Sequence, residues 1–67
     1  MNRRPVSSSN VASVGWDDGT MEVEFISGHL YQYHDVPESE YTALLGAASI
    51  GKELASIRGK YESTRLK

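Results

Sequence analysis

The chain of 67 residues has no cysteine, so it can form neither disulfides nor thiolate metal sites. No apolar run approaches the roughly 20 residues that a membrane-spanning helix needs. The polar start of the chain lacks the apolar segment of a signal peptide, so a cytoplasmic protein with no membrane association is predicted. His29 and His34 are five residues apart, so a regular strand would point them to opposite faces. We therefore expect no metal site, no cofactor and no enzyme activity.

Positive charge is missing from the middle of the chain. The stretch from Asp17 to Glu40 holds seven acids and neither lysine nor arginine. The stretch from Lys52 onward holds five bases, Lys52, Arg58, Lys60, Arg65 and Lys67, against two acids. The net charge of −2 is not typical of a nucleic-acid-binding domain taken as a whole. The segregation of charge nevertheless predicts a basic surface near the C-terminus.

Two hairpins are predicted in the first half of the chain. From Met21, apolar residues alternate with two glutamates, as in a half-buried strand, and Leu-Tyr-Gln-Tyr resumes strand character after Ser27-Gly28. An earlier strand, Val11 to Trp16, is followed by Asp18-Gly19, which is a strong turn signal. Strict alternation in that strand would put Ala12, Val14 and Trp16 on one face and Val11, Ser13 and Gly15 on the other.

The register of the second hairpin decides which face its tyrosines occupy. A three-residue loop pairs Phe25 with Tyr31 and Val23 with Tyr33, which gathers these four on one face and leaves the glutamates on the other. A two-residue loop instead pairs Phe25 with Leu30 and moves both tyrosines to the glutamate face. Because a slip of one residue flips every side chain, the two registers are exclusive, and the first separates apolar from polar better.

Two helices are predicted after Val36-Pro37. Proline is favoured at a first helical position, and a stripe of apolar residues follows it: Tyr41, Leu44, Leu45 and Ala48. Ser49 is a candidate N-cap for a second helix, which presents Ile50, Leu54, Ile57 and Tyr61 on one face. The expected fold is α+β, a three-stranded antiparallel β-meander followed by two helices packed on one face. Residues 1–5 are expected to form a disordered arm, 6–61 the domain and 62–67 a frayed tail.

The chain resembles the KTSC domain family. The shared features are Tyr31-Gln32-Tyr33, Val36-Pro37, Tyr41, the Ala48-Ser49-x-Gly51 junction and Ile57-Arg58-x-x-Tyr61. Such domains occur alone in bacterial and phage proteins and at the C-terminus of some lysyl-tRNA synthetases. The synthetase context implies RNA binding, and Tyr31, Tyr33 and Tyr61 correspond to family motif positions. Family members often carry an aromatic-Phe-Asn run after the glycine, where this chain has Glu53-Leu54-Ala55.

Two short motifs between the helices imitate enzyme signatures. Gly46 to Lys52 matches most of a phosphate-binding loop, but Glu53 stands where that loop needs serine or threonine, and no buried parallel strand precedes it. Ser49-Ile-Gly-Lys52 has the spacing of a penicillin-interacting nucleophile, but the further motifs of those enzymes are missing. Both are better interpreted as a helix-helix junction with Ser49 as the cap.

The sequence thus predicts a noncatalytic small binding domain. The best-motivated ligand is RNA, either tRNA-like or single-stranded, bound by Lys52, Arg58, Lys60, Arg65 and Lys67. The alternative function is that of a protein-protein interaction module or small homo-oligomer. For the oligomeric state itself, a monomer is favoured. Tyr31, Tyr33 and Tyr61 are expected in the core, although tyrosines on a sheet can also stack on bases.

Overall fold

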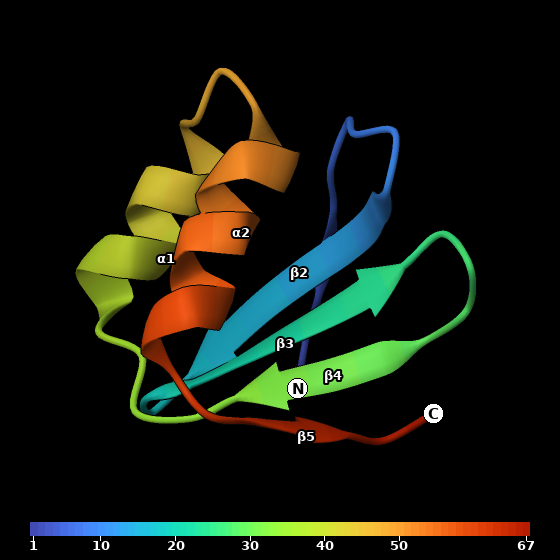
Figure 1. Cartoon of the computed structure of the whole chain (residues 1–67). Helices are drawn as coiled ribbons and strands as arrows, with labels where there is room; N and C mark the ends of the chain where they lie inside the picture. The colour runs from blue at the N-terminus through green and yellow to red at the C-terminus, as the bar shows by residue number, and fades with distance from the viewer.

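The computed structural model describes residues 1–67 and places two helices against one face of an antiparallel sheet (Figure 1). The elements are β1 (Arg4–Pro5), β2 (Val11–Asp17), β3 (Thr20–Phe25), β4 (Leu30–Tyr33), α1 (Glu38–Leu45), α2 (Ile50–Lys60) and β5 (Ser63–Arg65). The sheet order is β1-β2-β3-β4-β5, so each strand pairs with its neighbours in the chain. The predicted α+β class is confirmed, but the sheet has five strands instead of three.

The two additional strands are the edges of the sheet, where the sequence predicted an arm and a tail. In β1, Arg4 pairs with Val14 of β2. In β5, Arg65 pairs with Tyr31 of β4, and the backbone N–H of His34 donates to the Glu62 carbonyl at 2.8 Å just before the pairing begins. All the residues of these two strands are exposed. The pairing is made by backbone groups, so side-chain periodicity gives no sign of it.

The β3–β4 hairpin has neither of the two registers considered from the sequence. Val23 pairs with Tyr31 and Met21 with Tyr33, which is two residues away from the favoured register. The connection is longer than expected because the Phe25 N–H donates to the His29 carbonyl and Gly28, at φ 98°, donates to the Phe25 carbonyl. Since a shift of two residues preserves side-chain alternation, the predicted grouping of apolar side chains on one face is confirmed.

A β-bulge changes the face of one residue in β2. The pairing jumps from Val11 with Phe25 to Ser13 with Glu24, which leaves Ala12 as an extra residue. Val11 and Val14 are therefore both buried in the core, and the prediction that Val11 shares a face with Ser13 was wrong. The turn at Asp18-Gly19 is confirmed, with positive φ at both residues.

The core lies between the sheet and the helices. Its nine buried hydrophobic residues are Val11, Val14, Met21, Val23, Tyr33, Val36, Leu44, Leu54 and Ile57. Ser49 caps α2 as predicted, because its Oγ accepts the Lys52 N–H at 3.3 Å. Pro37 is the N-cap of α1 and not its first residue, and Ala48 lies outside the helix and is exposed. Neither helix has the length and apolar character needed to cross a bilayer.

Candidate nucleic-acid interface

The structure separates the predicted basic residues into three groups: Lys52 at the start of α2, Arg58 and Lys60 at its end, and Arg65 and Lys67 in and just after β5. Lys52 lies in the first turn of α2, and Arg58 and Lys60 lie in its last turn. Two helical positions are separated by about 200° around the axis, so Arg58 and Lys60 point to different sides. The Lys60 ammonium pairs with Glu40 of α1 at 3.0 Å. Arg58 thus points away from the side on which Lys60 meets Glu40, and it forms no ion pair.

The charge of Arg58 acts on Tyr33 at the end of β4. Burial raises the pKa of the Tyr33 hydroxyl, and the positive charge of Arg58 lowers it in part. The guanidinium therefore acts on the buried tyrosine at the end of β4. The two ion pairs of the chain use Arg3 and Lys60, so no carboxylate neutralises Arg58.

Arg65 lies at the sheet edge, and the backbone of Lys67 follows it. Arg65 is directly opposite Tyr31 in the β4–β5 pair, and directly opposite residues point to the same face. Its guanidinium donates to Nδ1 of His29 at 3.1 Å and to the Lys67 carbonyl at 3.0 Å. Both contacts are exposed, so water and ligands can compete for them.

Three aromatic rings lie in a row on this face. The Phe25 and Tyr31 rings meet edge to face with centroids 5.8 Å apart, and the Tyr31 and Tyr33 rings are stacked at 6.4 Å. Tyr33 is buried, as expected for a core residue. Tyr31 and Phe25 are only partly buried, because the helices cover one end of the sheet and the β3–β4 loop extends away from them (Figure 1).

Tyr61, the third motif tyrosine, joins the two helices. Its hydroxyl donates to the Glu40 carboxylate at 3.1 Å, beside the Lys60 ammonium. The hydrogen bond from Lys60, then that from Tyr61, lowers the pKa of Glu40, while the same carboxylate raises the pKa of Lys60. Tyr61 is partly buried against the core, so its role here is structural.

The opposite face of the sheet holds a polar cluster that the sequence analysis missed. Arg3 forms an ion pair with Glu22 and donates from Nε to the Ser13 hydroxyl at 3.1 Å. Gln32 donates to the other Glu22 oxygen at 3.0 Å. Burial alone would raise the pKa of Glu22, but the hydrogen bonds from Gln32 and Arg3 and the charge of Arg3 lower it overall. An arginine in a polar arm carries no local signal of such a contact.

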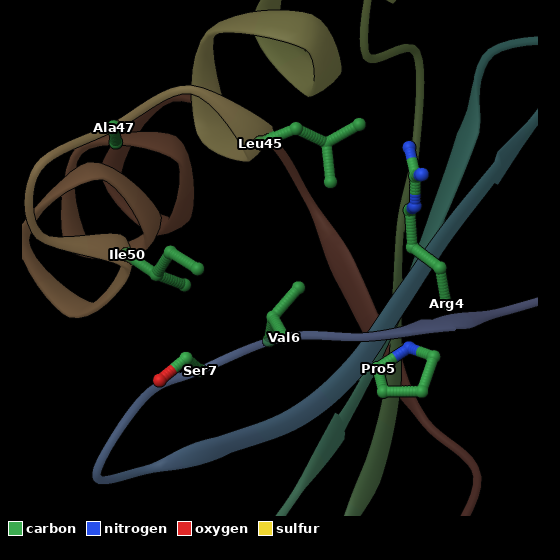
Figure 2. Close-up of a pocket in the computed structure, with 7 residues that line it drawn as sticks. All are labelled: Arg4, Pro5, Val6, Ser7, Leu45, Ala47 and Ile50. Atoms are coloured by element: carbon green, nitrogen blue, oxygen red, sulfur yellow. The ribbon is translucent and has the colours of Figure 1, made fainter.

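An open groove runs between the N-terminal segment and the helix junction. One cavity of about 420 Å³ is lined by Arg4–Ser7, Leu45, Ala47 and Ile50, and the side chains of Val6, Leu45 and Ile50 approach one another there (Figure 2). A second cavity of about 370 Å³ continues past Ser8–Asn10 and Ala48–Lys52. The phosphate-loop-like stretch lies here, but its Ser49 hydroxyl is used by the helix cap. No three His, Asp or Glu side chains of the chain are grouped to hold a metal ion.

Comparisons with known proteins agree on one family. The KTSC domain model matches residues 7–61. An uncharacterised protein of Stutzerimonas stutzeri (strain A1501) is 41% identical over 59 residues, which cover 85% of this chain and 83% of that protein. The crystal structure of a KTSC domain protein from Yersinia pestis has a TM-score of 0.92 at 35% identity and covers 98% of this chain and 97% of that one. The family match, the sequence identity and the shared fold together show that this chain belongs to the KTSC domain family.

Proposed function

We propose that this KTSC domain is a noncatalytic RNA-binding module that uses the basic surface formed by Arg58, Arg65 and Lys67. The observation that carries the proposal is that Arg65, which has no carboxylate partner, lies opposite the partly exposed Tyr31, while Arg58, also without such a partner, acts on Tyr33 of the same strand. Guanidinium groups suit phosphate because they offer several donors in one plane. Lys52 and Lys60, also predicted as ligands from the sequence, are excluded from this smaller surface by their positions on α2.

The distribution of acidic groups supports one orientation for a polyanion. Glu22 and Glu24 project from the other face of the sheet, where Ser13 donates to Glu24 at 3.0 Å. On that face Glu22 is neutralised by Arg3 and Glu24 has no basic partner, whereas the face of Arg65 offers positive charge without a carboxylate. The net charge of −2 therefore does not oppose binding at this surface.

The proposal can be tested by NMR titration of ¹⁵N-labelled protein. The probes are a pool of short single-stranded RNAs and a tRNA, each at about 50 and 200 mM salt, because phosphate contacts weaken steeply over this range. We expect shifts in residues 58–67 and in β4 that diminish with salt. Lys52→Gln should preserve them and Arg58→Gln should reduce them, although both remove one positive charge from α2. The absence of shifts with both RNAs at low salt would exclude RNA binding.

A second candidate, a protein-interaction module, is supported by the open edge of β5. The three residues of β5 are exposed, and the side of this strand away from β4 has no partner strand. The other edge, β1, contains Pro5, which cannot donate a backbone hydrogen bond. A partner strand could therefore extend the sheet only at β5. If copies of the chain pair there, the molar mass measured by light scattering will rise with concentration. A constant monomer mass over a hundredfold range would exclude self-association.

A further inference from the structure

The row of aromatic rings ends in solvent and not in the core. Tyr33 is 2% exposed and anchors the row against the helices. Tyr31 stacks on Tyr33 at an interplanar angle of 20°, and Phe25 supports Tyr31 from the side at 89°. Because its neighbours hold it from two directions, the Tyr31 ring is fixed in orientation while part of it remains accessible. A fixed, accessible ring can bind a planar ligand without ordering a mobile side chain.

A basic residue lies directly beside this ring. Arg65 is opposite Tyr31 in the β4–β5 pair, and the charge of Arg58 on α2 acts on the neighbouring Tyr33, where it lowers the pKa of the hydroxyl. The only side-chain partner of Arg65 is His29, through an exposed hydrogen bond that a ligand can replace. Tyr31 therefore offers a ring surface with the Arg65 guanidinium on the same face of the sheet, where an anionic group can be bound.

We infer that Tyr31, supported by Phe25, is a stacking site for an unpaired base of a single-stranded nucleic acid whose neighbouring phosphates contact Arg58 and Arg65. The inference rests on the RNA-binding function proposed above and names the form of its ligand. Bases of a single strand can leave their neighbours and stack on an aromatic ring, whereas bases of a duplex are covered on both sides by other pairs. The site therefore discriminates single strands from duplexes by stacking, and its arginines recognise only the backbone.

Stacking and phosphate contact can be separated by fluorescence anisotropy. The probes are a labelled mixed-sequence RNA ten-mer, its RNA duplex and the DNA ten-mer of the same sequence. We expect Tyr31→Leu to weaken binding of both single strands by about 5- to 150-fold, the range observed when one stacked base is lost. Tyr31→Phe keeps the ring and should bind nearly as the wild type does. The slope of affinity against salt should stay the same in Tyr31→Leu, because the arginines remain.

Matched arginine variants test the other half of the site. Arg58→Gln and Arg65→Gln should each lower the salt slope by about one phosphate contact, and Lys52→Gln should leave it unchanged. The RNA and DNA single strands should bind within about tenfold of each other, because neither stacking nor phosphate contact uses the 2′-hydroxyl. If the protein binds the RNA single strand but not the DNA single strand, contacts to the sugar and not Tyr31 carry the binding. That result would overturn the inference.

The outcomes distinguish this inference from the function on which it rests. If the wild type binds none of the three probes, RNA binding itself is refuted. If the wild type binds but the duplex binds as tightly as the single strand, or Tyr31→Leu binds as the wild type does, only the stacking site is refuted. If Tyr31→Leu does not give the NMR spectrum of a folded protein, the stacking site is tested by the Tyr31 ring protons of the wild type. Upfield shifts of the Tyr31 ring protons on addition of the RNA ten-mer support stacking, and unchanged ring protons in a bound protein overturn it.

Discussion

Replacement of Arg3 by leucine tests whether the N-terminal segment belongs to the folded domain. In the Arg3–Glu22 ion pair, the Glu22 side chain is 9% exposed and the Arg3 side chain is 28% exposed. Loss of one partner from a fully buried pair costs about 3–5 kcal/mol, and that figure is an upper limit here because Arg3 is partly solvated and Gln32 still donates to Glu22. We expect a loss of about 1–3 kcal/mol.

Urea denaturation followed by tryptophan fluorescence measures this loss. A domain of this size has a stability of about 3–5 kcal/mol, so the change removes a large share of it. With a urea dependence of about 1 kcal/mol per molar, the midpoint should fall by about 1–3 M. Arg4→Leu is the matched control, because it removes the same charge from the next residue, which is exposed and forms no ion pair. Equal midpoints for the two variants would refute the reasoning.

The pH dependence provides an independent check of the same contact. The pKa of Glu22 lies below its ordinary value in the folded protein, so this group stabilises the fold above the unfolded-state pKa of about 4.3. That contribution is lost as the pH falls below this value towards the lower folded-state pKa. Glu22→Gln should therefore reduce the slope of unfolding free energy against pH in this range. The double variant Arg3→Leu/Glu22→Gln should lose less than the sum of the two single losses, because no unpaired buried carboxylate is left.

Three further substitutions test the fold. Gly15→Ala places a Cβ about 2.5 Å from the Asn2 carbonyl oxygen, so we expect a loss of about 1–3 kcal/mol and NMR shifts along residues 2–5; unchanged shifts there would contradict the packing of this segment. Ser49→Ala removes the cap of α2 and should cost about 1 kcal/mol in thermal unfolding, whereas Ser56→Ala on an exposed helical position should cost little. Leu44→Ala leaves a cavity at a fully buried site, and its cost of about 2–5 kcal/mol should leave much of the protein unfolded by circular dichroism.

The sequence predicted the parts of the fold that depend on side-chain periodicity and turn chemistry. The central strands, the Asp18-Gly19 turn and the cap at Ser49 are local features, and the structure confirms each of them. The bulge at Ala12 and the long β3–β4 connection were missed because both depend on backbone hydrogen bonds, across strands at the bulge and within the loop at the connection. Such bonds are available to any non-proline residue, so they leave no pattern in the sequence.

The sequence predicted which residues of the candidate site are basic but not how they are arranged in space. Arg58, Arg65 and Lys67 were named because bases are concentrated near the C-terminus, yet the position of Arg65 opposite Tyr31 depends on β5, an exposed strand that side-chain pattern did not predict. Lys52 and Lys60 belonged to the same charge run and are directed elsewhere by helical geometry. A charge count predicts that bases are present near the C-terminus, and the geometry of α2 together with the pairing of β4 with β5 decides which of them share a surface.

The two faces of the sheet use arginine in opposite ways. On one face, Arg3 forms an ion pair with a buried carboxylate and holds the N-terminal segment on the sheet, so its charge is neutralised within the folded domain. On the other face, Arg58 and Arg65 stand beside aromatic rings without any carboxylate to neutralise them, in a chain that has nine acids and seven bases. Arg4, Lys52 and Lys67 also lack an ion pair, so what distinguishes Arg65 is its place directly opposite Tyr31 and not the missing carboxylate alone. Under the function proposed above, the arginines supply charge that complements a polyanion, and Tyr31 supplies a ring on which its bases can stack.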